Sequence, residues 1–331
     1  MKRVLLTGSA GFAGYHIVEH FLRHTDWQII GLDSFRHRGD SVRVGSDGRH
    51  LVYCHDLNAP ISTRLASQIG PVDYIINAAS ESHVDRSISD PIPFVQNNVN
   101  IALHMLDFAV RFGCEHFIQI STDEVFGPAL GGYDHQEWDH MLPSNPYSAS
   151  KAAQEAIAIS YWRTYGVPLT ITSTMNMFGE MQDSEKFVPK CIRAAITGET
   201  LTIHGTEQNI GSRKYLHSRN HADALMHILR WVKPTMYEEK EREVVKPNKF
   251  NVVGDVELDN LQLAKMVASI VGKELSYQFV DFHAITTRPG HDRRYSLDGS
   301  FLASTGWKAP VKFEDSLVST VVWYLNHGEW L

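Results

Sequence analysis

Short apolar runs alternate with helical patterns along the first half of the chain. Residues 4–6 form the first run, a helical pattern with Ile17, Val18 and Phe21 on one side follows, and residues 28–33 form the next run. This order is typical of a βαβ unit with parallel strands. Further strands are predicted at residues 51–54, 74–77, 117–120 and 169–172, and helices at residues 98–111 and 152–165.

The pattern becomes less regular after about residue 178. Helices are predicted at residues 189–197, 221–231, 261–271 and 313–326, strands at 201–204 and 250–253, and a charged surface loop at 233–249. Alternating strands and helices predict an α/β fold with a Rossmann-type doubly wound parallel sheet. We expect this domain to span residues 1–177, with segments around 215–231 and 250–254 returning to it. A smaller, less regular C-terminal lobe would occupy most of residues 178–331.

Composition narrows the classes of function. The 331-residue chain has a net charge of −7 and no run of basic residues, so it lacks the positive surface that nucleic acids require. Cys54, Cys114 and Cys191 lie far apart, which predicts free thiols, no metal site and a cytoplasmic location. Because no stretch approaches about 20 apolar residues, no membrane-spanning segment is expected.

The loop after the first predicted strand is rich in glycine, with Gly8, Gly11 and Gly14 at intervals of three residues. Without side chains there, backbone N–H groups and the next helix N-terminus can approach a pyrophosphate. Close helix packing would explain the glycines alone, but Asp33 ends the second strand, where an acid can accept from an adenosine ribose. We therefore predict a dinucleotide site with Gly8, Gly11, Phe12, Ala13, Gly14 and Asp33.

Charge beside the ribose bears on which dinucleotide binds. The carboxylate of Asp33 would repel the 2′-phosphate of NADP, which favours NAD as the cofactor. Arg36 and Arg38 oppose this argument, because arginine accommodates a 2′-phosphate. Asp56 and Leu57 follow the third predicted strand and are candidates for contact with the adenine, although a helix cap or turn would explain the acid equally well.

A tyrosine and a lysine four residues apart, Tyr147 and Lys151, would lie on one face of a helix. A nearby ammonium and a nicotinamide cation both favour the phenolate, so we expect them to lower the pKa of Tyr147 from about 10. Such a tyrosine can accept the proton of a substrate hydroxyl while hydride leaves the same carbon. The spacing is common on amphipathic helices, but here it follows a dinucleotide turn, which favours a catalytic role.

Two adjacent acids, Asp123 and Glu124, follow Thr122 and the predicted strand at residues 117–120. This is the carboxyl edge of the sheet, where doubly wound folds bind ligands. A solvated turn or a helix cap would also explain the acids. Beside a Tyr/Lys pair, however, one carboxyl can hold a proton while its neighbour stays ionised, which divides acid and base roles. We expect the pair to titrate as one coupled unit.

Together these motifs resemble the extended short-chain dehydrogenase/reductase superfamily, and within it the nucleotide-sugar 4,6-dehydratases, the dTDP-glucose 4,6-dehydratase family among them. The resemblance covers most of the chain. The glycine-rich turn and residues 146–151 resemble the whole superfamily, whereas Thr122-Asp123-Glu124 is specific to the dehydratases and residues 288–295 support the same group. Residues 78–87 and 185–189 are further matching blocks.

The resemblance implies an enzyme, a hydro-lyase with tightly bound NAD that converts an NDP-hexose, NDP-glucose, into the 4-keto-6-deoxy sugar. C4 is oxidised, water is eliminated across C5–C6, and hydride is returned to C6. The implied roles are Tyr147 as the base at O4, with Lys151 beside it, and Thr122 as the hydrogen-bond partner of that oxygen. Glu124 would remove the C5 proton, and Asp123 would protonate the departing O6 hydroxyl.

The same resemblance extends the binding sites and makes the C-terminal lobe a nucleotide-sugar-binding lobe. The cofactor site would also include Ala78, Ala79, Ser80, Tyr147 and Lys151. The nucleotide-diphosphate sugar would contact Ser82, His83, Thr122, Asn176, Glu185, Lys186, Arg213, Asn251, Arg288 and His291, with His83 in a supporting role. Arginine suits a pyrophosphate because its fork can bond two oxygens. A homodimer through the helices at 98–111 and 152–165 is also implied.

Two stretches depart from the family pattern. Residues 176–178 read Asn-Met-Phe where the family has two asparagines and a tyrosine, and Glu180 replaces a proline. Residues 214–220 also differ from the family's run. We expect both stretches to lie near the nucleotide pocket, so thymidine, uridine, cytidine and guanosine diphosphates are all candidates for the nucleotide.

Three other functions compete with the dehydratase. A nucleotide-sugar 4-epimerase would use the same Tyr/Lys pair and NAD but has no need of Asp123 and Glu124. A decarboxylating enzyme for UDP-uronic acids is disfavoured for the same reason. An idle NAD-binding sensor or scaffold belongs to another class, and the presence of every expected catalytic side chain counts against it.

Overall fold

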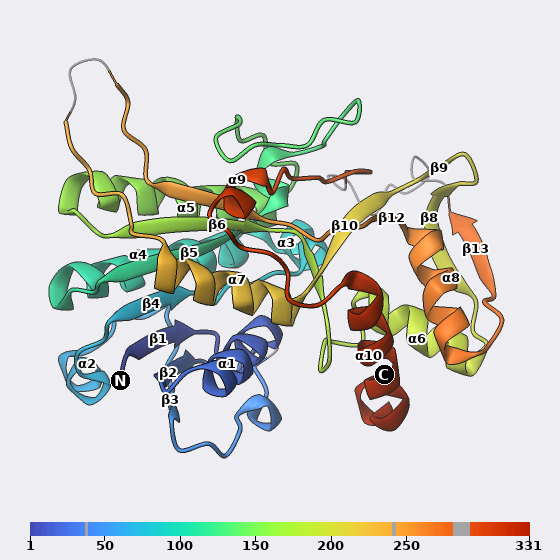
Figure 1. Ribbon diagram of the computed structural model, residues 1–331, viewed down its shortest axis with the longest axis horizontal. Helices are drawn as coiled ribbons and strands as arrows, with labels where there is room; N and C mark the ends of the chain where they lie inside the picture. Colours follow the sequence, from blue (N-terminus) through green and yellow to red (C-terminus); the bar gives the residue numbers. More distant parts are fainter. Residues whose placement is uncertain (37–38, 240–242, 281–291) are drawn as a thin grey trace.

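A parallel β-sheet forms the centre of the computed structural model, which describes residues 1–36, 39–239, 243–280 and 292–331. Within these residues the largest sheet has seven strands in the order β11-β6-β5-β4-β1-β2-β3 (Figure 1). All of its pairings are parallel, which confirms the predicted Rossmann-type sheet. The strands are β1 (Arg3–Thr7), β2 (Gln28–Asp33), β3 (His50–Cys54), β4 (Tyr74–Asn77), β5 (His116–Thr122), β6 (Leu169–Thr174) and β11 (Asn248–Val252).

Helices cover both faces of this sheet. On one face α1 (Phe12–His24) and α7 (Ser218–Trp231) pack together and against the strands. On the other face lie α2 (Thr63–Ile69), α4 (Pro91–Phe112) and α5 (Pro146–Tyr165). Every residue of β4 and β5 is buried as a result, which explains why these strands are continuous runs rather than alternating patterns.

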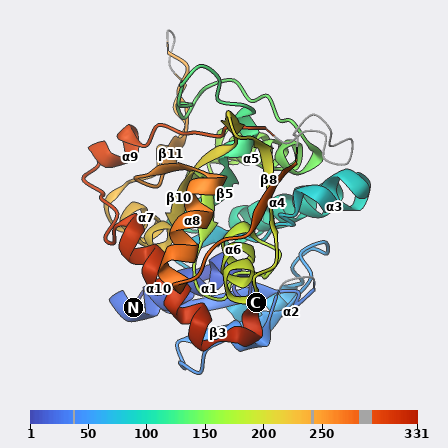
Figure 2. The same ribbon diagram turned by 90° about the vertical axis from the view of Figure 1, so that its right-hand side faces the viewer.

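A second hydrophobic core lies beyond the carboxyl edge of the sheet, at the right of Figure 1. Its helices are α6 (Phe187–Thr197), α8 (Asn260–Val271) and α10 (Phe313–Asn326). Two small sheets accompany them, β12-β10-β7 and β13-β8-β9. Their strands β8 and β10 are labelled in Figure 2. The strands are β7 (Asn176–Phe178), β8 (Leu201–Thr206), β9 (Asn209–Ile210), β10 (Ser212–His217), β12 (Glu257–Asp259) and β13 (Tyr277–Val280).

Short elements complete the described chain. They are the helices α3 (Val84–Ser89) and α9 (Ser300–Ser304), and 3₁₀ turns at Ser41–Arg43, Asp123–Phe126 and Gly328–Trp330. None of the described helices combines the length and the apolar character that crossing a membrane requires. The division of the chain into domains at residue 177 stays a prediction.

Several elements begin earlier than the sequence pattern predicts. The helix predicted at 98–111 starts at Pro91, and the one predicted at 152–165 starts at Pro146. Proline suits the first helical turn, where its missing N–H would have no intrahelical partner. The predicted surface loop at 233–249 is wrong at its end, because β11 begins at Asn248 and Lys249 is 1% exposed.

Lys249 can be buried because it is paired. Its Nζ donates to Glu155 Oε2 at 2.6 Å, and both side chains are buried. The second carboxylate oxygen of Glu155 accepts from the Ser121 hydroxyl. Aromatic carbon closes the site, since the Lys249 ammonium lies 4.6 Å from the centre of the Phe126 ring. The ion pair therefore joins β11, α5 and the end of β5.

We predict that Lys249→Met lowers the free energy of unfolding by about 3–5 kcal/mol, because it leaves the Glu155 carboxylate buried without its cation. The double variant Glu155→Gln/Lys249→Met should recover much of this loss, since no charge then remains buried. Urea denaturation of both variants measures the effect. Lys273→Met, at an exposed position, is the control and should unfold like the wild type. A single variant as stable as the wild type would contradict the prediction.

Candidate active site

The glycine-rich turn after β1 is shaped by close backbone contacts. Gly8 has a φ of +70°, and its N–H donates to the Leu32 carbonyl at 2.8 Å. A Cβ on Gly14 would lie 2.0 Å from the Gly8 carbonyl oxygen, so only glycine fits there. Gly11 caps α1 without a side chain, and the start of this helix lines a cavity of about 370 Å³. The arrangement leaves room for a pyrophosphate at the N-terminus of α1.

Asp33 stands at the end of β2 beside this turn. Its carboxylate accepts from the backbone N–H groups of Ala10 and Phe35, both at 2.9 Å, and it lines the same cavity. Asp56 also lines the cavity and forms an ion pair with Arg36 at 3.1 Å. Arg36 is therefore held by an acid at the cavity rim. Arg38 lies outside the described residues.

The structure places all the residues predicted for the cofactor at this one cavity. They are Gly8, Gly11, Phe12, Ala13, Gly14, Asp33, Asp56, Leu57, Ala78, Ala79, Ser80, Tyr147 and Lys151. The N–H groups of Ala78 and Ala79 both donate to Thr7 Oγ1, which fixes the loop after β4 against the glycine turn. A cavity formed by bare backbone at one end and by an acid at its rim fits a dinucleotide.

The acid pair lies where β5 ends in a 3₁₀ turn. The Thr122 hydroxyl donates to Asp123 Oδ1 at 2.9 Å, while Asp123 Oδ2 is buried without a hydrogen-bond partner among the described residues. Burial raises the pKa of Asp123 to about 6. Burial, followed by the charge of Asp123, raises the pKa of Glu124 to about 7. The two carboxyl groups together can therefore hold one proton near neutral pH.

Tyr147 and Lys151 lie on the first turns of α5. The Lys151 ammonium donates to the Ile120 carbonyl at 2.6 Å and to Gln154 Oε1 at 2.7 Å, and burial lowers its pKa to about 8. The expected fall in the pKa of Tyr147 is not found. Burial and the charge of Glu124 raise it well above 10, although a hydrogen bond with Thr122 acts in the opposite direction. The ammonium is directed at the end of β5, which explains the difference.

Two residues at this site were not identified from the sequence. Asn145 caps α5, accepting from the Ser148 N–H, and donates to Glu124 Oε2 at 3.2 Å. The Asn-Pro dipeptide at the start of the helix is a capping signal that could have revealed it. Gln154, the second partner of the Lys151 ammonium, lies three residues along the same helix. Both orient groups of the predicted catalytic set.

The residues predicted for the substrate separate into three groups. Ser82, His83, Thr122, Asn176, Glu185 and Lys186 line the first cavity. All of these except Thr122 also border a second cavity of about 480 Å³ in the C-terminal lobe. Arg213 lines only the second cavity. Asn251 lines neither, because its buried amide donates to the carbonyls of His135 and Asp298. Arg288 and His291 lie outside the described residues.

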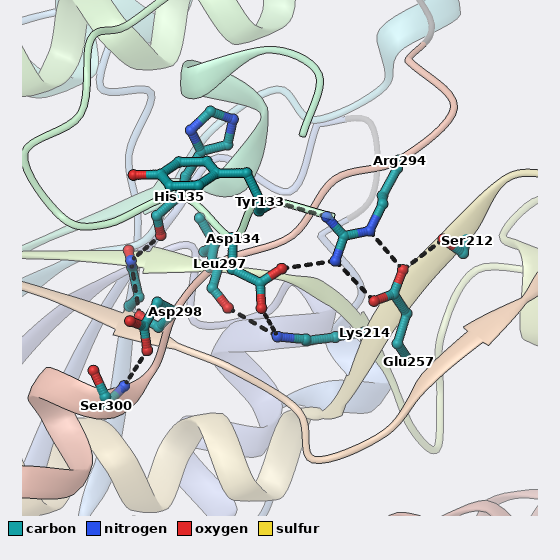
Figure 3. A network of polar contacts seen from close by, with 11 residues as sticks. Tyr133, Asp134, His135, Ser212, Lys214, Glu257, Arg294, Leu297, Asp298 and Ser300 are labelled. Atoms are coloured by element: carbon teal, nitrogen blue, oxygen red, sulfur yellow. Dashed lines mark hydrogen bonds and ion pairs between the residues drawn. The ribbon is translucent and has the colours of Figure 1, made fainter. Parts of the chain in front are cut away.

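The guanidinium of Arg213 is directed at backbone rather than into open space. It donates to the Asp292 carbonyl at 2.7 Å and lies 4.6 Å from the centre of the Tyr295 ring. The segment it holds is also tied down by charge (Figure 3). Arg294 donates to Asp134 and to Glu257, and Lys214 donates to Asp134 at 2.7 Å. This network joins the loop before α5 to β10 and β12 at the border of the second cavity.

The stretches that depart from the family pattern were expected near the nucleotide pocket, and this is only partly so. Asn176 and Met177 line the first cavity. Glu180 and His217, however, line neither cavity and lie next to each other, with Glu180 Oε2 3.2 Å from His217 Nε2. Within these stretches Glu180 and His217 thus form a contact away from both cavities, whereas Asn176 and Tyr215 line the second cavity.

A parallel sheet with a glycine cradle and a buried Tyr/Lys/acid set at its carboxyl edge defines a Rossmann-type, dinucleotide-dependent enzyme. Comparison with known families narrows the class. The model of the "NAD dependent epimerase/dehydratase family" matches residues 4–238, and the chain belongs to this family. The superfamily and the cofactor NAD predicted from the sequence are thereby confirmed.

Similar proteins cover the chain almost completely. It is 35% identical to the low-salt glycan biosynthesis protein Agl12 of Haloferax volcanii, over 98% of this chain and 99% of that protein. It is 32% identical to dTDP-glucose 4,6-dehydratase 1 of Escherichia coli, over 99% and 94% of the two chains. Among solved structures, the dTDP-glucose 4,6-dehydratase DesIV of Streptomyces venezuelae with NAD bound gives a TM-score of 0.86 at 32% identity, covering 99% and 98%.

We predict that Gly14→Ala abolishes NAD retention, because the added Cβ would overlap the Gly8 carbonyl and force the cradle apart. Gly48→Ala is the matched control, since a Cβ there meets nothing within 4 Å. The NAD content of each purified variant, released by denaturation and quantified by chromatography, measures the effect. A Gly14→Ala protein that melts like the wild type and retains its NAD would contradict the prediction.

Proposed function

We propose that the protein is a nucleotide-sugar 4,6-dehydratase that converts an NDP-hexose, NDP-glucose, into the NDP-4-keto-6-deoxy sugar. The observation that carries this proposal is the buried pair of Asp123 and Glu124 beside Tyr147, at the same cavity as the dinucleotide cradle. Removing and returning protons during loss of water requires an acid and a base close together. A pair that shares one proton near neutral pH supplies both.

NAD, when bound along the glycine turn and Asp33, supplies the oxidation at C4 and the later reduction at C6. Tyr147 accepts the proton of the C4 hydroxyl, and Thr122, its hydrogen-bond partner, shares that oxygen. Because burial keeps Tyr147 protonated in the protein alone, it can act as a base only while positive charge lies close to its ring. Lys151, buried behind it with a pKa of about 8, fixes the helix position against β5.

The acid pair carries out the elimination. A ketone at C4 acidifies the neighbouring C5 proton, which Glu124 removes, while Asp123 protonates the hydroxyl that leaves C6. Asn145 holds Glu124 through a hydrogen bond at 3.2 Å, and Thr122 holds Asp123. Because the two carboxyls titrate as one coupled unit near neutral pH, the proton that they share can reside on Asp123 while Glu124 is ionised.

The second cavity is the proposed place for the nucleotide diphosphate. Lys190 and Arg193 line it, together with His204 and Tyr295, so cationic and aromatic groups suited to phosphates and a base occur together. Arg213 also lines it, but its guanidinium donates to backbone carbonyls. The first cavity shares Glu185 and Lys186 with it, which would bring the hexose to the acid pair. Thymidine, uridine, cytidine and guanosine remain candidates for the nucleoside.

Mass spectrometry of reaction mixtures tests the proposal. The purified protein is mixed separately with dTDP-glucose, UDP-glucose, CDP-glucose and GDP-mannose, without added NAD. Loss of one water from one of these sugars is the expected result and identifies the nucleotide. If the masses stay unchanged but NMR shows inversion at C4, the result would instead support an epimerase. No change in any of the sugars would overturn the proposal for these substrates.

We predict that Asp123→Asn lowers the rate of water loss by about 10²–10⁴-fold, the usual contribution of a positioned acid. Tyr147→Phe should prevent turnover at least as strongly, since C4 oxidation precedes every later step. Asp107→Asn on α4, whose half-exposed side chain pairs with Arg111 and lines neither cavity, is the control and should leave the rate unchanged. An Asp123→Asn enzyme with a normal rate would remove the acid pair from the reaction.

The pH dependence of kcat should be bell-shaped, with a maximum between about pH 6 and pH 7, the pKa values of Asp123 and Glu124. Below this range both carboxyls are protonated and no base remains; above it both are ionised and no acid remains. Steady-state rates across this range, measured in one constant-ionic-strength buffer, give the profile. A flat profile between pH 5 and pH 8 would exclude the pair as the titrating groups.

A homodimer through α4 and α5 is also proposed. Both helices carry exposed apolar side chains, among them Ile92, Val110, Phe112 and Tyr165, which are between 43% and 69% exposed. A second copy would cover them. Light scattering of the purified protein distinguishes a dimer from a monomer. A cytoplasmic location stays a prediction.

A further inference from the structure

Glu180 lies between two buried histidines that come from distant parts of the chain. His16 Nε2, on α1, lies 3.0 Å from the Glu180 carbonyl oxygen. His217 Nε2, at the end of β10, lies 3.2 Å from the Glu180 carboxylate. The two rings meet edge to face with their centres 5.6 Å apart. Backbone and side chain of one residue are thus held by two imidazoles.

The tautomers of these histidines follow from their other contacts. His217 Nδ1 accepts from the Arg219 backbone N–H at 3.0 Å, so the neutral ring carries its proton on Nε2, facing the carboxylate. His16 Nε2 must likewise carry a proton to donate to a carbonyl. Burial lowers the pKa of both rings, that of His16 to about 4, which keeps them neutral donors near pH 7. Burial opposes ionisation of Glu180, but the His217 contact outweighs it and lowers the pKa to about 2.

The turn that contains Glu180 has an uncommon backbone. Gly179 has a φ of +157°, and a Cβ there would lie 3.1 Å from His16 Nε2 and 3.2 Å from His217 Nε2, so the glycine makes room for both rings. Met181 has a φ of +60°, a left-handed value that is rare for methionine. Such a backbone persists only where its surroundings hold it.

Side chains from three other parts of the chain hold the carbonyls of the same turn. Arg43 donates to Met181 at 2.7 Å, and the Tyr324 hydroxyl of α10 donates to Gln182 at 2.8 Å. The Ser218 hydroxyl donates to Phe178 at 3.2 Å. Glu180 is the only residue of the turn 178–182 with a side-chain carboxylate, and this carboxylate lies beside His217. The turn is therefore fixed from every side, by α1, α7 and α10.

This turn leads directly into a wall of the first cavity. Gln182, Asp183, Glu185 and Lys186 line the same cavity as the glycine cradle. On α1, His16 lies one turn beyond Phe12, and the centres of the two rings are 5.2 Å apart. The contacts of Glu180 thus join the helix that begins at the cradle to the segment that forms this part of the cavity wall.

We propose that Glu180, His16 and His217 form a positioning cluster that sets the distance between the cofactor helix α1 and the cavity wall at residues 182–186. None of the three lines the cavity, so they act through the residues that do. This distance matters first for binding of the dinucleotide and second for binding of the nucleotide sugar. Only the second part rests on the proposed dehydratase function.

NAD retention and steady-state kinetics of three variants test the cluster. Glu180→Ala and His217→Phe, the latter keeping a ring against Phe178, should each release NAD about tenfold more readily and raise KM for the sugar more than they lower kcat. Because the two residues act as one unit, the double variant should lose no more NAD than either single one. Glu180→Gln should retain NAD, since the glutamine keeps an oxygen where the carboxylate lies 3.2 Å from His217 Nε2.

Glu19→Gln, an exposed charge change on the same helix, is the control and should match the wild type. Normal NAD content in both Glu180→Ala and His217→Phe, or losses that add in the double variant, would overturn the proposal. If Glu180→Ala does not fold, the comparison of His217→Phe with Glu180→Gln still decides it. NAD content does not depend on which sugar reacts, so failure here is distinct from failure of the proposed function.

Discussion

Burial of charge at the carboxyl edge of the sheet is the constraint on which the rest of the site depends. Asp123 and Glu124 have raised pKa values because the cavity floor excludes water, and that floor is formed by side chains that must themselves be satisfied. The ion pair of Glu155 and Lys249 anchors the strand end just before the acids through Ser121. This polar layer joins the end of β5, which carries the proposed catalytic acids, to α5 and β11, and it does so by burying two ions.

The same layer explains the behaviour of Lys151. Its ammonium is fixed by the Ile120 carbonyl and by Gln154, so it is a structural link between α5 and β5 as much as an electrostatic neighbour of Tyr147. Burial, followed by the charge of Glu124, consequently raises the pKa of Tyr147. In its proposed role as a base, Tyr147 would need additional positive charge close to its ring.

Local signals in the sequence were enough to predict the sheet and to place all the residues expected at the cofactor in one cavity. Glycine spacing, an acid at the end of β2, and polar residues after buried strands are all short-range patterns, and parallel strands bring them to one edge. Contacts between distant segments could not be predicted in this way. Lys249 was assigned to a surface loop because a lone lysine gives no sign of a buried partner on another helix. Asn251 was assigned to the substrate by resemblance, yet its amide holds a loop.

Glu180 and His217 show why a departure from a family pattern needs a structure to be interpreted. From the sequence, each of these two residues suggested a changed nucleotide pocket, because each lies close in sequence to residues that line a cavity. They are 37 positions apart and in contact, so the introduced carboxylate meets an imidazole that can donate to it. A buried acid without that donor would carry a desolvation cost. The two residues therefore satisfy each other away from both cavities, whereas Asn176 and Tyr215 of the same two stretches line the second cavity.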